Sequence, residues 1–112
     1  MKVENMKYFG NMDNPTSWAY VQGPCGDNMK FYLLIDNGII KDVKFNTDGC
    51  TFTVACGAMT AHLVLGKSIN EALGISSGQV MNELDGLPKE HIHCSILAVT
   101  TLYRAIADYL LR

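Results

Sequence analysis

Residues 91–112 read HIHCSILAVTTLYRAIADYLLR, a His-x-His-Cys-Ser run that opens into an apolar segment. Apolar side chains recur in this segment every three or four positions, which predicts a helix with one buried face. The residues expected on that face are Ile96, Val99, Tyr103, Ile106 and Leu110. Arg104, Asp108 and Arg112 fall outside it and can stay in water.

Cys94 lies at the start of this predicted helix, next to His93. The first N–H groups of a helix have no partner within it, and the helix dipole favours negative charge there. We therefore expect an accessible Cys94 whose thiolate forms more easily than that of a free cysteine. His93 adds an imidazole, a second ligand for a soft or borderline metal ion.

The composition predicts one globular domain over residues 1–112, since 48% hydrophobic content is enough for a core. A net charge of −2 argues against a partner that is a nucleic acid or a membrane surface, because neither polyanion would attract the chain. Residues 1–7 lack an apolar signal core, and no run approaches the roughly 20 apolar residues that span a bilayer. A cytoplasmic protein is expected.

Strand signals precede helix signals along the chain. Residues 19–22, 29–35 and 39–45 read as strands, with Asp36-Asn37-Gly38 as the hairpin turn between the last two. In the last strand we expect one face to hold Ile39, Lys41, Val43 and Phe45 and the other Ile40, Asp42 and Lys44.

The second half of the chain carries the helix signals. The helices expected before the C-terminal one are 51–65, 69–73 and a third from Ser76 or Ser77 to about Leu84. Ser68 and Glu71 have the spacing of a capping box. The order predicts an α+β fold: an antiparallel sheet of about three strands in the N-terminal half, helices packed on one face, and a long C-terminal helix.

Three of the four cysteines, Cys25, Cys50 and Cys94, lie on turns or at the junction of a turn and an element. Their polar neighbours are Asp27, Asp48 and His93, respectively. Three thiolates with a carboxylate or an imidazole complete a tetrahedral site for zinc, or for iron in a cluster. No Cys-x-x-Cys pair is present, so such a site must be assembled from distant segments. The alternative is three unrelated buried cysteines.

Several longer motifs follow one another from about residue 23 to residue 112. They are Cys25-Gly26-Asp27-x-Met29-Lys30, Phe45-x-Thr47-x-Gly49-Cys50 leading to Ala55, Gly66-Lys67-Ser68 with Glu71-Ala72, Leu87-Pro88, His93-Cys94-Ser95-Ile96-Leu97-Ala98, and Ala105-Ile106-Ala107-Asp108-Tyr109. In these motifs, and in cysteine separations of 25 and 44 residues, the chain resembles the IscU/NifU-type iron–sulfur cluster scaffold family.

The resemblance implies an IscU/SufE-like fold and a non-enzymatic scaffold that assembles a [2Fe–2S] cluster and passes it to apo acceptor proteins. Cys25, Cys50 and Cys94 match the three cluster-binding cysteines of the family, Asp27 its aspartate and His93 its histidine. Iron or the cluster would be bound by these residues, and zinc can take their place in the cluster-free form.

The resemblance also implies partners. A cysteine desulfurase would supply sulfur as a persulfide, with Cys94 as the acceptor. Asp27, a hard ligand among soft thiolates, would hold iron loosely and so assist release. Where related scaffolds usually carry a Leu-Pro-Pro-Val-Lys-like chaperone motif, residues 87–91 read Leu-Pro-Lys-Glu-His, and this partial match argues against a dedicated chaperone. The oligomeric state stays open, a homo-oligomer included.

The remaining candidates have plainer interpretations. Cys56 is expected to be a buried small residue rather than a spare sulfur acceptor. His91 is interpreted as an exposed loop histidine rather than an extra ligand. His62 is expected to be packed or at the surface.

Other classes of protein fit part of the pattern. A zinc-bound sulfurtransferase of the same superfamily usually carries an insertion between the second and third cysteines, for which 44 residues leave little room. A small interaction module with a structural zinc would have a closed site that is essential to folding. A cysteine hydrolase fits least, because nothing indicates an oxyanion hole and adjacent His93 and Cys94 are poorly arranged as base and nucleophile.

Overall fold

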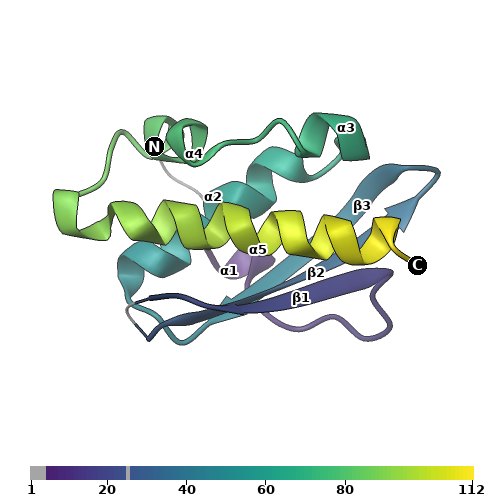
Figure 1. Cartoon of the computed structure of the whole chain (residues 1–112), viewed down its shortest axis with the longest axis horizontal. Helices are drawn as coiled ribbons and strands as arrows, with labels where there is room; N and C mark the ends of the chain where they lie inside the picture. The colour runs from purple at the N-terminus through teal and green to yellow at the C-terminus, as the bar shows by residue number, and fades with distance from the viewer. Residues whose placement is uncertain (1–4, 25) are drawn as a thin grey trace.

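The structure, a computed structural model, describes residues 5–24 and 26–112 (Figure 1). The elements in chain order are α1 (Asn5–Tyr8), β1 (Ser17–Gln22), β2 (Asn28–Asp36), β3 (Ile39–Thr47), α2 (Thr51–Val64), α3 (Ile69–Ala72), α4 (Ser77–Glu83), the 3-10 helix η1 (Lys89–His91) and α5 (Ile92–Leu110). Strands precede the main helices, which confirms the predicted α+β class.

Within the described residues, β1, β2 and β3 form one antiparallel sheet in that order. Every second residue of β2 is buried, namely Met29, Phe31, Leu33 and Ile35. The predicted hairpin turn is confirmed: Asn37 at φ 53° and Gly38 at φ 73° both adopt the left-handed conformation that a two-residue hairpin loop needs.

The alternation predicted for β3 is confirmed from Asp42 to Phe45 and is wrong from Ile39 to Lys41. The buried residues of this strand are Ile40, Val43 and Phe45. Leu34 of β2 pairs with Asp42. The next residue, Ile35, pairs with Ile40, so Lys41 is an extra residue and forms a β-bulge. The bulge moves Ile40 to the face that Val43 and Phe45 already occupy.

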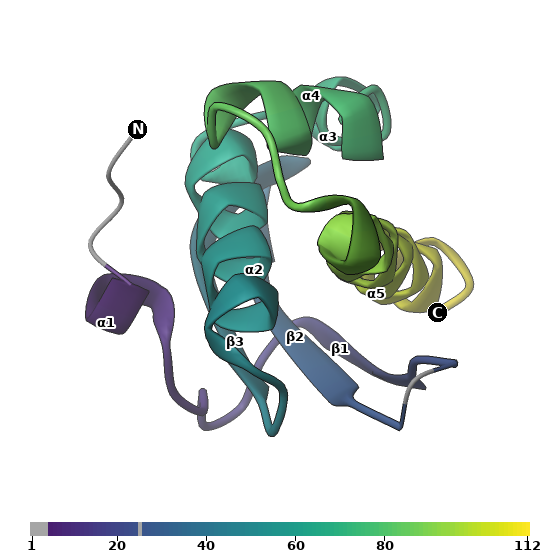
Figure 2. The same cartoon turned by 90° about the vertical axis from the view of Figure 1, so that its left-hand side faces the viewer.

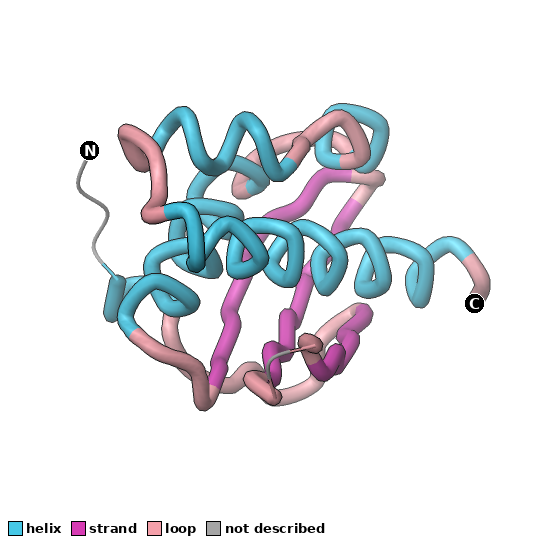
Figure 3. Tube along the Cα trace, turned by 60° about the vertical axis from the view of Figure 1, so that its left-hand side comes forward, coloured by secondary structure: helices cyan, strands magenta, loops and turns pink. Residues whose placement is uncertain are grey.

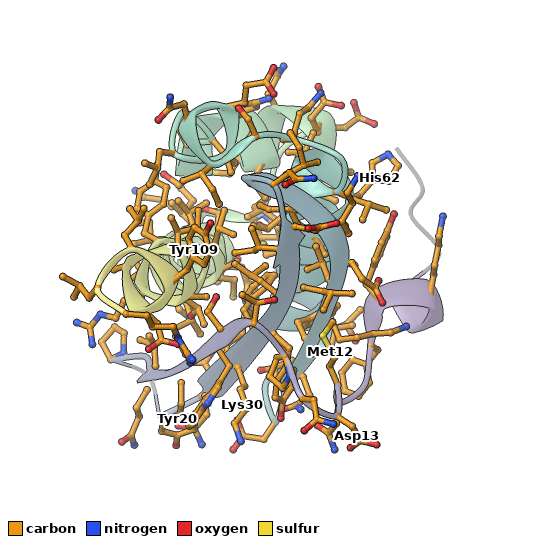
Figure 4. The ribbon with its side chains drawn as sticks, turned by 90° about the vertical axis from the view of Figure 1, so that its right-hand side faces the viewer. Met12, Asp13, Tyr20, Lys30, His62 and Tyr109 are labelled. Carbon is orange, nitrogen blue, oxygen red and sulfur yellow. The ribbon has the colours of Figure 1, made fainter. Side chains whose placement is uncertain are left out.

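Helices α2 and α5 cover the same face of the sheet, with α3 and α4 beyond them (Figure 2). Helix α5 lies over β1 and β2 (Figure 3). Gly57 lets α2 approach β3 closely, because a Cβ there would lie 2.5 Å from Cε2 of Phe45. On the other side of the sheet, Tyr20 and Lys30 point away from the helices (Figure 4).

The buried face of α5 differs from the predicted one. Val99 and Ile106 are buried, but Ile96, Tyr103 and Leu110 are 52%, 37% and 57% exposed, respectively. Small side chains make up much of the buried face, which holds Cys94, Ser95, Leu97, Ala98, Val99, Thr101, Leu102, Ala105 and Ile106. The prediction followed bulky side chains, whereas close packing of α5 against β1 and α2 selects small ones.

The two ends of α5 have different surroundings. Near its end, Asp108 Oδ2 accepts a hydrogen bond from the backbone N–H of Trp18 in β1 at 3.2 Å and pairs with Arg112 at 2.9 Å. The start of α5 lies at the opposite end of the molecule, beside the start of α2 and the connection between β1 and β2 (Figure 1). Among the described residues, no helix has the length and apolar character needed to cross a membrane.

Candidate metal site

The starts of α2 and α5 bring together side chains that are far apart in the sequence. Cys50 is the residue that caps the start of α2, and His93 and Cys94 lie in the first turn of α5. Asp27 reaches them from the connection between β1 and β2, where Gly23 leaves room for it. A Cβ on Gly23 would lie 2.9 Å from Asp27 Oδ1.

Thr53, a fully buried residue in the first turn of α2, connects these groups. Its hydroxyl donates to Asp27 Oδ2 at 3.1 Å and lies 3.3 Å from Cys94 Sγ and 3.7 Å from Cys50 Sγ. A hydroxyl has one proton, so Thr53 accepts at Cys94, and the Cys94 thiol donates. Gly49 leaves the space for this side chain, since a Cβ there would lie 2.7 Å from it.

Two sets of potential metal ligands meet at Cys94. One set is Cys50, His91 and Cys94, and the other is Asp27, His93 and Cys94. Within each set the ligand atoms all lie within 4.8 Å of one another. Thiolates with imidazole are donors that suit zinc and iron.

A buried carboxylate oxygen adds a second reason to expect a cation. Asp27 Oδ1 is buried and has no hydrogen-bond partner among the described residues. An unpaired buried oxygen with partial negative charge is costly unless a cation or a proton satisfies it. The site residues therefore fit a metal ion for two reasons: their donor atoms suit it, and a cation would satisfy the unpaired Asp27 Oδ1.

The two described thiols of the site differ in burial and acidity. Cys50 is exposed, and the nearby backbone N–H of Thr53 at the start of α2 lowers the pKa of its thiol. Cys94 is fully buried, and this desolvation raises the pKa of its thiol.

The prediction of an accessible, easily ionised Cys94 is therefore wrong. Its side chain points from the first turn of α5 toward Thr53 rather than toward solvent. The loss of water outweighs any benefit of the helix N-terminus. The benefit predicted for Cys94 applies instead to Cys50, whose thiol stays exposed at the start of α2.

The other predicted residues have distinct positions. Cys25 lies outside the described residues. Asp48 stays apart from the site and accepts hydrogen bonds from the backbone N–H and Nδ2 of Asn28 at 2.8 and 2.9 Å. Cys56 is buried as predicted, which raises its pKa to about 12. His62 lies far along α2, with its Nδ1 3.1 Å from Tyr8 Oη (Figure 4).

Sequence reasoning missed Thr53 and undervalued His91. Thr53 follows Cys50 by three residues, the spacing at which side chains at a helix start meet, and this was the available signal. His91 was interpreted as an exposed loop residue, but it is half-buried, with its Nδ1 3.9 Å from Cys50 Sγ.

The sequence profile of one protein family, described as the NifU-like N terminal domain, matches residues 2–112. The chain belongs to this family. The fold and the clustering of site residues at the starts of α2 and α5 are consistent with this match.

Several similar proteins are named as iron–sulfur cluster assembly scaffolds. Two proteins of Archaeoglobus fulgidus, each called iron-sulfur cluster assembly scaffold protein IscU, are 40% identical over 96% of this chain. The chain spans only 65% of the length of those two proteins. The iron-sulfur cluster assembly scaffold protein IscU of Haemophilus influenzae is 41% identical over 95% of this chain and 87% of its own length.

Solved structures share the fold. The crystal structure of a putative iron-sulfur cluster assembly scaffold protein for the SUF system from Fervidobacterium islandicum has a TM-score of 0.72, with 89% of this chain and 87% of that chain covered. The two sequences are 23% identical, so this likeness concerns the fold.

The first testable prediction follows from the unequal thiols. We expect iodoacetamide to modify Cys50 faster than Cys94 or Cys56, since among these three described cysteines Cys50 alone is exposed and has a lowered pKa. Alkylation of Cys50 should reach half its maximal rate at a lower pH than in the same chain unfolded in urea, because a lowered pKa gives thiolate at lower pH. Peptide mapping by mass spectrometry measures each cysteine separately. Faster modification of Cys94 would contradict the assignment.

The second prediction concerns the Thr53 hydroxyl. The nearly isosteric change Thr53→Val leaves the Asp27 carboxylate and the Cys94 thiol without their shared partner, and should cost about 1–3 kcal/mol of unfolding free energy. Thr53→Ser, which keeps the hydroxyl, should retain most of the hydrogen-bond contribution. Urea unfolding measures both. In an Asp27→Ala background the cost of Thr53→Val should shrink, and an unchanged cost would show that the hydroxyl does not act through Asp27.

Proposed function

We propose that the chain is a non-enzymatic scaffold on which a [2Fe–2S] cluster is assembled from iron and persulfide sulfur, before transfer to apo acceptor proteins. The observation that carries this proposal is the meeting of Asp27, Cys50 and Cys94, with two histidines, at the starts of two helices. Membership of the family and the scaffold names of relatives support it.

Each site residue has a role in this proposal. The thiolates of Cys25, Cys50 and Cys94 bind the cluster iron, because thiolate is the ligand that iron–sulfur clusters use most. Asp27 completes the set through a hard carboxylate that binds iron less firmly than a thiolate. His93, with Nε2 3.7 Å from Cys94 Sγ, can replace Asp27 or bind a zinc ion in the cluster-free protein.

Sulfur comes from a cysteine desulfurase as a persulfide. The sequence resemblance implies Cys94 as the acceptor, but the exposure of Cys50 and its lowered pKa favour Cys50 for the first capture. The Cys50 thiolate attacks the terminal sulfur of the donor persulfide, a new S–S bond forms, and the donor leaves as a thiolate. A thiol or ferredoxin-type electron donor then reduces this sulfur to sulfide. We place this sulfur transfer and cluster assembly in the cytoplasm, a compartment that keeps thiols reduced.

Anaerobic reconstitution tests the proposed function. Protein given ferrous iron, cysteine and a cysteine desulfurase should develop a thiolate-to-iron charge-transfer spectrum that moves to an added apo-ferredoxin. The spectrum should be lost in Cys25→Ser, Cys50→Ser and Cys94→Ser and kept in the control Cys56→Ala, a buried cysteine apart from both ligand sets. A colourless protein that keeps zinc and still accepts persulfide would identify a sulfurtransferase instead.

The acceptor of sulfur can be identified by residue. We expect mass spectrometry, after brief exposure to desulfurase and cysteine without iron, to find the extra sulfur on Cys50 in the wild type. Cys94→Ser should retain this labelling, and Cys50→Ser should lose most of it. Labelling confined to Cys94 would show that the start of α5 opens in the complex with the donor.

Replacing Asp27 tests the role of a loose ligand. The variant Asp27→Ala should hold its cluster longer in air than the wild type, because a weakly bound, exchangeable ligand position is removed. The decay of visible absorbance after exposure to oxygen gives the lifetime, and Asp48→Ala is the control for a carboxylate that lies apart from the site. Equal lifetimes for Asp27→Ala and wild type would refute this role.

A further inference from the structure

His91, interpreted from the sequence as an exposed loop residue, lies beside the thiol of Cys50. It ends η1, directly before α5, and its ring stacks on Phe52 with the centroids 4.1 Å apart and the planes inclined by 24°. Phe52 belongs to the first turn of α2, so this contact joins the starts of both helices. The stacking fixes the imidazole before any ligand arrives, which lowers the entropic cost of using it.

The fixed ring directs a nitrogen at the thiols. His91 Nδ1 lies 3.9 Å from Cys50 Sγ, and both atoms lie within 4.8 Å of Cys94 Sγ. In a tetrahedral zinc site with ordinary Zn–S and Zn–N bonds, sulfur and nitrogen ligands lie about 3.6 Å apart. The observed separation therefore needs an adjustment of only a few tenths of an ångström to accept an ion.

We propose that Cys50, His91 and Cys94 bind a single divalent ion of borderline softness, Zn²⁺ or Fe²⁺, in the cluster-free protein, with His91 Nδ1 as a ligand. The inference adds a ligand to the site of the proposed function and rests on it. Neither the family match nor the sequence motifs assign this role to His91.

The proposed set differs from the one formed by Asp27, His93 and Cys94. It contains the exposed thiol of Cys50 and the half-buried ring of His91, so an ion can reach it from solvent. Cys94 belongs to both sets.

Cobalt(II) tests this ligand set apart from cluster assembly. Anaerobic titration of the wild type with Co²⁺ should give sulfur-to-cobalt charge-transfer bands and visible bands of a tetrahedral ion. His91→Phe removes the nitrogen but keeps an aromatic ring to stack on Phe52. It should weaken Co²⁺ binding about tenfold or more and shift the visible bands. The matched control His62→Phe, at a histidine outside both sets, should bind Co²⁺ as the wild type does.

A second measurement needs no variant that might fold poorly. The chain has three histidines, and long-range ¹H–¹⁵N spectra show which ring nitrogen of each one binds a metal. One equivalent of Zn²⁺ should shift Nδ1 of His91 to the metal-bound range and leave the ring of His62 unchanged.

The outcomes separate the inference from the proposed function. A His91 ring unaffected by Zn²⁺, or His91→Phe with the affinity and bands of the wild type, overturns the inference even if clusters assemble normally. Metal binding through His91 in a protein that never assembles a cluster supports the inference and removes the scaffold proposal. A wild type that binds neither Co²⁺ nor Zn²⁺ overturns the inference.

Discussion

The site depends on one buried hydroxyl. Thr53 donates to Asp27 and accepts from Cys94, and through these bonds the start of α2 holds the β1–β2 connection and the start of α5 in place. Without that hydroxyl, the half-buried carboxylate of Asp27 and the buried thiol of Cys94 would lie side by side with nothing between them. Such a pair is costly unless a proton or a metal ion is shared, so Thr53 makes the metal-free arrangement tolerable.

The same arrangement divides the work between two cysteines. Cys50 meets solvent and the backbone N–H groups of α2, conditions that favour a nucleophilic thiolate. Cys94 lies under α2 with no exposed surface, which suits a ligand that must not be lost to solvent once iron is bound. The two thiols thus differ in exposure and in pKa because Cys50 precedes α2, whereas Cys94 faces inward from the first turn of α5.

Features that depend on neighbours in sequence could be predicted. The turn at Asn37 and Gly38 and the capping box of Ser68 with Glu71 both form as expected, because each is decided within four residues. The bulge at Lys41 and the burial of Cys94 could not be predicted, since they depend on how β2 and α2 lie against these residues. The cysteines identified the region of the site, whereas its bonding pattern required tertiary structure.

The hydrogen bond from Trp18 to Asp108 has a mechanical consequence. It fastens the end of α5 to the edge strand, while the start of the helix carries His93 and Cys94. From Asp108 to Cys94 the helix is a stiff rod about 21 Å long. Pivoting about that fastening, a tilt of about 5° moves Cys94 by about 2 Å. The packing of α5 against β1, β2 and α2 therefore sets the separation of the Cys50 and Cys94 thiols, because even a small tilt of so long a helix would change it.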